Sequence, residues 1–414
     1  MRVDGLCYSV AKEIGTISPV ALIIGCIIAV PTAYVVLVTV YLVVVTLAAM
    51  LYRRPRPVDA PALKMAMVIP AHNESSQILD ILGDAEKLDY PKNSFAVFVV
   101  ADNCDDDTAD LARGAGAKVL ERHDLENRGK GQALDWCFKT HGAELEAYDV
   151  IALVDADMVL DLGFLEAMNR SFQVEGVQVV QGLNTVAEPG RHWRAAIGYM
   201  SFSCINHVRP AGRYMLGGTA DLRGSGMAFR RDLILARGWP AHSLAEDAEF
   251  AKQLLFDGIK VAYNPDALVT SPIPEQHSQA TIQQERWEGG KRILFKTYFP
   301  RLLRGAVTKP GIAMWDALLD ILVPPLSVLG ALIAGCLLAS LLVHPVLILV
   351  NLVALCGLAF YVLMGLILTR APLKVWLYLC AVPVFLVWKA PLIIRVLLGK
   401  VSSGWQRTPR DSEL

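Results

Sequence analysis

The chain has 414 residues, of which 54% are hydrophobic and only 19% are charged, a balance that excludes an ordinary soluble enzyme. Its 39 basic and 40 acidic side chains leave a net charge of −1, so no global field would recruit nucleic acid. The eight cysteines form no Cys-x-x-Cys pair and no zinc-like spacing with histidine, which argues against a disulfide framework or a structural zinc.

Residues 1–56 predict an N-terminal tail followed by a transmembrane helix. Between Gly15 and Tyr52 there is no charged residue and no histidine, and this stretch exceeds the roughly 20 apolar residues that cross a bilayer. It is also longer than the apolar core of a cleaved signal peptide. A basic run, 53–56, follows directly, and by the positive-inside rule it places the next domain in the cytoplasm.

Residues 57–290 predict an α/β domain. Short β-branched runs alternate with helical patterns, and the first four strands begin near Met65, Phe95, Lys118 and Val150. This alternation predicts a doubly wound, mainly parallel sheet, in which ligands bind beyond the carboxyl ends of the strands.

Polar residues follow three of the predicted strands, at 70–74, 101–105 and 155–157, and we expect them to meet in one crevice. The first strand is not followed by Gly-x-Gly-x-x-Gly, and the chain has no Walker-type Gly-Lys-Ser/Thr, so neither a dinucleotide dehydrogenase nor a P-loop NTPase fits. Asp155 and Asp157 flank a single residue and can hold a hard cation such as Mg²⁺ or Mn²⁺, which would neutralise a diphosphate.

Two further motifs lie later in this domain. Glu246 and Asp247 precede a helical pattern, a position that suits helix capping and catalysis equally. Gln283, Arg286 and Trp287 form a Gln-x-x-Arg-Trp pattern shortly before the chain becomes apolar again, where an amphipathic surface helix is the alternative.

In this order, the motifs resemble the membrane-embedded branch of the family-2 inverting glycosyltransferases, which includes cellulose, chitin and hyaluronan synthases. The resemblance implies an α/β GT-A domain with a Rossmann-like, mainly parallel sheet, flanked by transmembrane helices. It also implies that a sugar passes from a UDP-sugar to a growing polysaccharide with the help of Mg²⁺ or Mn²⁺. It rests on the Pro-Ala-His-Asn-Glu run ending at Glu74, the Asp102 loop, the Arg-Gly-Lys-Gly run around Lys130, the Asp155/Asp157 pair, Glu246-Asp247 and Gln283/Arg286/Trp287.

The resemblance further implies roles for individual residues. Asp247 would be the catalytic base that deprotonates the acceptor. From its position alone, Lys130 suits a helix surface as well as a nucleotide contact. The other roles are donor binding by Glu74, Asp102, Lys130, Asp155 and Arg286, acceptor binding by Trp287, Gln283 and Glu246, and metal binding by Asp157.

Residues 291–311 mix basic and apolar side chains, which predicts an amphipathic helix on an anionic leaflet. Residues 312–400 then predict transmembrane or interfacial helices. Uncharged stretches at Ile321–Val343 and Pro345–Thr369 are of spanning length and predict a helical hairpin.

A third apolar stretch, Val375–Trp388, is short for a crossing and leads into a basic tail, 401–414. The positive-inside rule favours a cytoplasmic tail, whereas a third complete span would export it; a re-entrant or interfacial helix would resolve this conflict.

We therefore expect a multi-pass inner-membrane protein with a cytoplasmic catalytic domain. Its partners would be a UDP-sugar, a carbohydrate or lipid-linked acceptor and the bilayer, with an oligomer or export partner left open and no nucleic acid. Single-sugar transfer to a lipid is the alternative within the enzyme class. A non-catalytic nucleotide-sugar-binding membrane protein would lack the base and the metal ligands, and a transporter would carry ionisable residues inside its spans.

Overall fold

The computed structural model describes residues 19–56, 62–275 and 277–397. The extreme N-terminal tail, 1–18, and the predicted basic tail, 401–414, lie outside the described residues. The described chain divides into two compact units. One consists of residues 19–44 and 323–361, and the other of residues 45–322 and 362–397.

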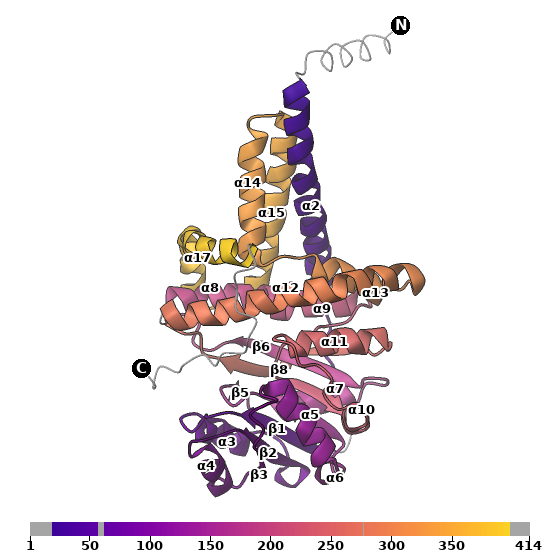
Figure 1. Cartoon of the computed structure of the whole chain (residues 1–414), viewed down its shortest axis with the longest axis vertical. Coiled ribbons are helices and arrows are strands. Elements are labelled where there is room, and N and C mark those ends of the chain that lie inside the picture. The colour runs from indigo at the N-terminus through magenta and orange to yellow at the C-terminus, as the bar shows by residue number, and fades with distance from the viewer. Residues whose placement is uncertain (1–18, 57–61, 276, 398–414) are drawn as a thin grey trace. The chain divides into compact units, whose positions relative to one another are not determined.

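The second unit is built on an eight-stranded sheet with the order β3-β2-β1-β4-β7-β6-β8-β5 (Figure 1). Six strands run parallel to one another, whereas β7 and β5 are antiparallel to their neighbours. The mainly parallel sheet is therefore confirmed, with two antiparallel strands in its second half. The strands are β1 Met65–Ala71, β2 Phe95–Asp102, β3 Lys118–Arg122, β4 Val150–Leu153, β5 Val159–Leu160, β6 Val179–Val186, β7 Met227–Arg230 and β8 Val261–Ser271.

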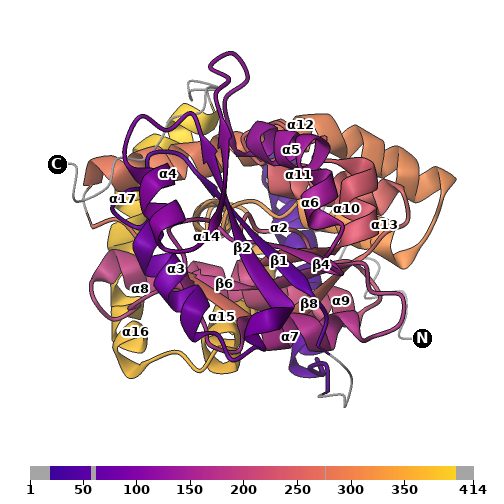
Figure 2. The same ribbon diagram turned by 90° about the horizontal axis from the view of Figure 1, so that it is seen from below.

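Helices cover both faces of this sheet (Figure 2). Successive residues of a strand point to opposite faces, so Met67 and Ala152 join the core under α3 and α7, whereas Val68 and Leu153 are buried on the other side. On the first face lie α3 Ile78–Lys87, α4 Thr108–Gly114 and α7 Phe164–Phe172. On the second lie α5 Lys130–Thr140, α6 Gly142–Leu145 and α10 Arg231–Arg237, and a 3-10 turn, η1 Lys92–Ser94, precedes β2.

Further helices of this unit pack beyond the sheet. Leu255, Tyr298, Leu302 and Met314 join α11, α12 and α13 in one apolar cluster.

α12 continues without a break across residue 290, where we placed a domain boundary, so the Gln283 motif and the amphipathic segment share one helix. These helices are α8 Trp193–Phe202, η2 Ser203–Val208, α9 Arg209–Met215, α11 Glu246–Phe256, α12 His277–Thr308, α13 Ile312–Ile321, α16 Leu373–Leu377, η3 Tyr378–Ala381 and α17 Val382–Leu397.

A buried charge network joins α9, α11 and α13. The Arg213 guanidinium lies 2.8 Å from Asp316 Oδ2 and 3.0 Å from Asp320 Oδ2. It also faces Asp221, which pairs with Lys252 of α11. Because unpaired charges are costly in an interior, this network holds α11, the helix that begins with Glu246 and Asp247, in a fixed place against α13.

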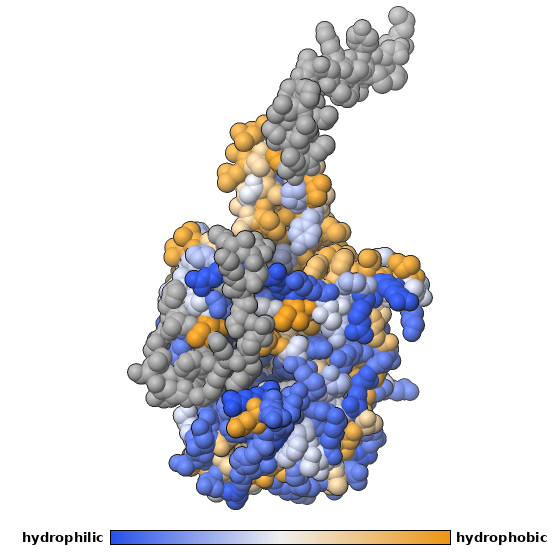
Figure 3. Space-filling view, viewed as in Figure 1, coloured by the Kyte–Doolittle hydropathy of each residue, from blue (hydrophilic) through white to orange (hydrophobic). Residues whose placement is uncertain are grey.

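The first unit contains most of α2 Pro19–Met50 and α15 Pro345–Leu368, together with α14 Leu326–Ser340. The three helices lie side by side (Figure 1), and their surface is largely apolar (Figure 3). Inside the bundle, Asn351 Nδ2 donates to Ser340 Oγ at 3.0 Å and to Thr32 Oγ1 at 3.3 Å. An apolar exterior around a small polar interior suits a bilayer.

Three described segments are long and apolar enough to cross a membrane: Ile28–Met50, Pro345–Leu368 and Leu373–Pro391. A fourth candidate arises only if α13 and α14 count as one bent span. The predicted span over Ile321–Val343 is broken in the structure, since α13 ends at Ile321 and α14 covers only Leu326–Ser340. The helix stops after Ile321 because Pro324 and Pro325 cannot donate backbone hydrogen bonds, and α14 alone, at 15 residues, is about 22 Å long.

Candidate active site

The loops after β1 and β2 are joined by hydrogen bonds, as expected for neighbouring parallel strands. Asn73 has a φ of 56°. Its Oδ1 accepts a hydrogen bond from the Asp105 amide at 3.0 Å, and its Nδ2 donates to the Asp105 carboxylate at 2.5 Å. Asparagine tolerates this left-handed conformation better than most residues. The Glu74 amide donates to Thr108 Oγ1 at 2.8 Å, and the Glu74 side chain is buried. The loop therefore holds a carboxylate at the carboxyl edge of the sheet.

Asp102, at the end of β2, is buried against an arginine that our sequence reasoning missed. Arg122 Nη1 donates to Asp102 Oδ1 at 2.6 Å, and the two residues are register partners across β2 and β3. Asn103 Nδ2 adds a second hydrogen bond at 2.8 Å. The signal was available, because extending the predicted third strand from Leu120 to Arg122 would have placed this pair side by side.

Lys130 opens α5 and turns into the crevice. Its ammonium lies 2.5 Å from Asp155 Oδ1 and also donates to the Gly224 carbonyl. The start of α5 packs closely against the backbone of Ala241 because the next residue is Gly131, where a Cβ would lie 2.3 Å from the Ala241 carbonyl oxygen. The side chain of Lys130 is only 20% exposed, so it does not lie on a helix surface. Its contact with a nucleotide stays a prediction.

The loop 223–226 lies against three candidate residues, Lys130, Asp155 and Asp247. Asp155 donates its amide to Ser225 Oγ at 3.0 Å, and Gly224 has a φ of 79° with Asp247 Oδ2 3.6 Å from where a Cβ would stand. Gln181 of β6, fully buried, accepts from the Arg223 amide at 2.8 Å and donates to the Ser225 carbonyl at 3.0 Å. Gln181 thus holds the loop in place although it lies 42 positions before Arg223 in the sequence.

Glu246 and Asp247 form the first turn of α11. Aromatic packing holds this helix on the sheet, with the rings of Phe250 and Phe229 of β7 centred 5.8 Å apart. Burial, followed by the charge of Asp247, raises the pKa of Glu246 to about 7. Burial also raises the pKa of Asp247, although a hydrogen bond from the Ala248 amide and the charge of Lys130 oppose the rise.

Lys130 and Asp155 belong to the same electrostatic cluster. Burial raises the pKa of Asp155, and the nearby Lys130 ammonium opposes that rise. Burial disfavours the charged form of Lys130, but Asp155 and Glu246 outweigh it and raise the pKa of the lysine. Three carboxyl groups thus share one ammonium, and such clustered, shifted groups in a crevice are typical of catalytic sites.

The Gln-x-x-Arg-Trp motif lies on α12, which passes directly beside this turn. A Cβ on Gly290 would stand 3.1 Å from the Cβ of Ala245, the residue before Glu246. One turn earlier, Trp287 packs on Phe202 with ring centroids 5.8 Å apart. Gln283 and Arg286 share this stretch of α12. The structure thus brings the motif's helix to the start of α11, while the roles of Gln283, Arg286 and Trp287 stay predictions.

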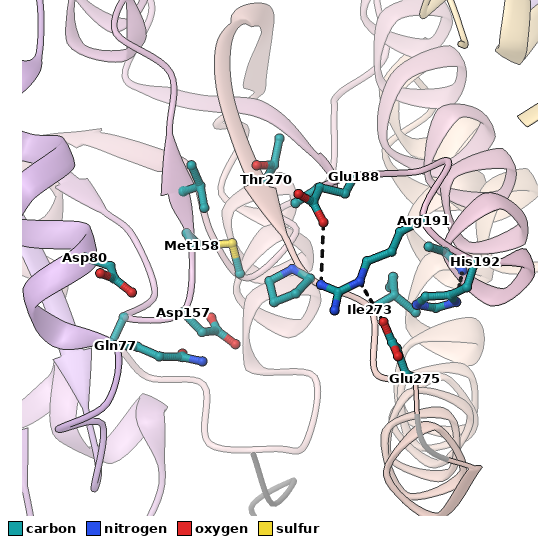
Figure 4. A pocket seen from close by; sticks show the side chains of 15 residues that line it. Gln77, Asp80, Asp157, Met158, Glu188, Arg191, His192, Thr270, Ile273 and Glu275 are labelled. Carbon is teal, nitrogen blue, oxygen red and sulfur yellow. Dashed lines mark hydrogen bonds and ion pairs between the residues drawn. The ribbon is translucent and has the colours of Figure 1, made fainter. Parts of the chain in front are cut away.

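Asp157 borders a pocket whose lining residues do not include Asp155. It lines a pocket of about 440 Å³ beyond the carboxyl ends of β4, β6 and β8 (Figure 4). Arg191 crosses this pocket, with its Nε 2.7 Å from Glu275 Oε1 and its Nη1 3.5 Å from Glu188 Oε2. Gln77 lines the wall formed by the start of α3. A ligand that bridges Asp155 and Asp157 would therefore extend towards this pocket.

Asp155 and Asp157 fit an incomplete site for a hard divalent cation. Within residues 19–56, 62–275 and 277–397, no group of three or more His, Cys, Asp or Glu side chains is arranged to hold a metal ion. Mg²⁺ is usually held by one or two carboxylates together with substrate phosphates and water. Two aspartates at a strand end match that partial ligand set, which a diphosphate would complete.

Comparison with solved structures defines the class of fold. A mannosyltransferase, PcManGT from Pyrobaculum calidifontis in complex with GDP-Man and Mn²⁺, matches with a TM-score of 0.55 and 18% sequence identity. The match covers 88% of this chain and 99% of that chain. The α/β unit of this protein therefore has the GT-A fold.

The sequence comparison identifies the family. The model described as "Glycosyltransferase like family 2" matches residues 61–290, more than half of the chain. This chain belongs to that family of glycosyltransferases.

Its curated relatives differ in product. It is 27% identical over 270 residues to a beta-monoglucosyldiacylglycerol synthase of Trichormus variabilis, covering 62% of this chain and 55% of the relative. It is 24% identical over 251 residues to a poly-beta-1,6-N-acetyl-D-glucosamine synthase of Staphylococcus aureus, covering 57% of this chain and 56% of the relative. The chain thus spans a little more than half the length of these relatives.

Proposed function

We propose that this protein is a membrane-bound inverting glycosyltransferase that transfers a sugar from a UDP-sugar to a growing polysaccharide. One observation carries the proposal: Lys130, Asp155 and Asp247 converge around the loop 223–226 at the carboxyl edge of the sheet. Ligands of open α/β sheets bind at that edge. We place the catalytic domain on the cytoplasmic side of the inner membrane, where nucleotide sugars are made.

Asp247 would serve as the base. An inverting transfer needs a proton acceptor on the side of the incoming hydroxyl, opposite the departing nucleoside diphosphate. The raised pKa of Asp247 strengthens it as a base compared with a solvent-exposed aspartate. Glu246, whose pKa is about 7, lies beside it and would contact the acceptor.

The donor would bind across the ends of β1, β2 and β4. Glu74 and Asp102 would hold the uridine, and Asp155 with Lys130 the ribose and diphosphate. Asp157 would bind Mg²⁺ or Mn²⁺, which supplies positive charge next to the diphosphate when bound. Arg286 would add a second cationic group on the leaving side. Both charges would stabilise the leaving diphosphate as the glycosidic bond breaks.

The acceptor would lie against α12. Trp287 offers a flat apolar ring to the C–H face of a sugar, a contact that accepts successive identical units. Gln283 lies one helical turn before it on the same helix. This arrangement supports chain extension, as does the similarity to a polymer synthase.

Transfer of one sugar to a lipid is the second candidate. It is supported by the similarity to a glucosyldiacylglycerol synthase. The three or four candidate spans among the described residues would also leave little room for a polymer channel within one subunit. Such an enzyme needs the same donor site and a hydrophobic acceptor, but no channel.

Product size separates the two. The full-length protein in lipid nanodiscs would be incubated with Mg²⁺ or Mn²⁺ and a series of labelled UDP-sugars, with GDP-mannose for comparison. Long products from one UDP-sugar support the polysaccharide synthase. Products one sugar larger than an added lipid support the lipid glycosyltransferase. Transfer from GDP-mannose alone would contradict the proposed uridine site at Glu74 and Asp102.

A further inference from the structure

The candidate span Leu373–Pro391 packs against the catalytic unit. It is interrupted, since the short helix α16 is followed by the 3-10 turn η3 and then by α17. Val375 joins an apolar cluster with residues of α8, and the rings of Phe385 and Trp193 are centred 6.4 Å apart. Apolar composition alone therefore does not decide whether this segment crosses a membrane.

Lys389 of α17 forms a buried ion pair with α12. Its ammonium lies 2.8 Å from Glu288 Oε1, and the two side chains are only 6% and 8% exposed. A charge buried in this way is retained when it is paired, and removing one partner leaves the other uncompensated. Glu288 directly follows Trp287, so the ion pair fixes α17 against the part of α12 that carries the Gln-x-x-Arg-Trp motif.

A second ion pair joins the same two helices. Arg395 Nη1 lies 3.3 Å from Glu285 Oε1, but the arginine side chain is 60% exposed. Exposed pairs contribute little because water screens them. The two pairs connect the same helices and differ in burial, which makes the Arg395 pair a matched control for the Lys389 pair.

The opposite side of the segment is apolar and uncovered. Leu373, Leu377, Val384 and Val387 are each more than 60% exposed. A helix that packs one face on a protein and leaves an apolar face free has the pattern of a helix lying in the membrane surface. A helix crossing the bilayer would instead carry Lys389 towards the hydrocarbon, where a charged side chain is costly.

We propose that Lys389 is a positioning residue, and that through Glu288 it sets the place of the acceptor-binding Trp287 while α16 and α17 lie along the membrane surface on the catalytic side. The positioning role rests on the proposed function, because it needs Trp287 to contact the acceptor. The placement of the segment is independent of any activity.

The positioning role is tested with Lys389→Met in the full-length protein in nanodiscs. We expect the KM for the acceptor to rise by roughly 10- to 100-fold, because small displacements of positioning groups have effects of this size. The donor KM and the slow release of UDP to water are expected to change less than the acceptor KM, because Arg286 is the one proposed donor-binding residue on α12 and the others lie at the edge of the sheet. Arg395→Met is expected to leave all these constants near wild type.

A charge reversal keeps the test decisive if the single variant folds poorly. The double variant E288K/K389E restores an ion pair and is expected to recover most of the lost acceptor affinity relative to either single reversal. If Lys389→Met slows UDP release to water and sugar transfer to the acceptor by the same factor, Lys389 has a purely structural role, and the proposal is overturned. A double variant no better than the single reversals would overturn it as well.

The placement of the segment is tested in sealed membrane vesicles. One protease-cleavable tag is added at the C-terminus, and another is inserted at the exposed turn Glu175-Gly176 of the catalytic unit. Cleavage of both tags from the same side of the vesicle supports a surface helix, and cleavage from opposite sides overturns it. If no donor sugar is turned over, the proposed function and the positioning role fail, and the vesicle result still decides the placement of α17.

Discussion

Glu246→Gln is expected to remove a pH-dependent loss of stability from this protein. Burial and the adjacent Asp247 raise the pKa of Glu246 from its ordinary value of 4.5 to about 7. The pKa of Glu246 is higher in the folded state than in the unfolded state. The stabilising effect of the protonated Glu246 carboxyl is therefore fully present below pH 4.5 and is lost as the pH rises through about 7. The difference between the two values corresponds to about 3 kcal/mol of folding free energy.

The assay is thermal unfolding of the full-length protein in one detergent at pH 5 and pH 8. At pH 8 we expect the Glu246→Gln midpoint to exceed wild type by roughly 6–12 °C, since about 1 kcal/mol moves the midpoint by about 2–4 °C in domains of this size. At pH 5 the two midpoints should nearly coincide. Glu175→Gln, at an exposed turn, is the control and should follow wild type at both pH values. An unchanged pH dependence in Glu246→Gln would refute this electrostatic reasoning.

Two further predictions concern the buried carboxylate of Asp102 and the proposed metal ligand Asp157. Arg122→Met leaves Asp102 buried without its cation and is expected to cost about 3–5 kcal/mol of folding free energy, measured by denaturant unfolding. Arg113→Met, at an exposed pair, should cost at most about 1 kcal/mol, and equal losses in the two would contradict this account. Asp157→Asn is expected to raise the Mn²⁺ concentration needed for half-maximal activity. Losing a residue that only hydrogen-bonds to a metal ligand weakens metal binding by roughly 10- to 100-fold, and losing a direct ligand should weaken it more. An unchanged Mn²⁺ titration would remove Asp157 from the metal site.

The first half of the sheet was predictable because its signals are local. β-branched runs alternate with amphipathic helices, and parallel strands place their carboxyl ends at one edge, so the positions of Glu74, Asp102 and Asp155 followed from the pattern. The second half was not predictable in this way. β7 lies between β4 and β6 because of pairings that no local pattern records.

The supporting residues were missed for a related reason. Arg122 reaches Asp102 through cross-strand register, Gln181 fixes the loop of Ser225 from β6, and Lys389 meets Glu288 across 101 positions of sequence. Such partners are set by tertiary packing. The break after Ile321 is different, because the Pro-Pro pair at 324–325 was a local signal that outweighed the apolar composition around it.

The most direct test of the central claim is the rate of UDP release by Asp247→Asn. Wild-type and variant protein would be assayed in nanodiscs with the preferred UDP-sugar, acceptor and Mn²⁺, and binding of the donor would be measured on the same samples. We expect the variant to bind the donor as wild type does and to transfer sugar roughly 10²- to 10⁴-fold more slowly, the range that a positioned base contributes. Transfer at the wild-type rate would contradict the assignment of Asp247 as the base of a glycosyltransferase site.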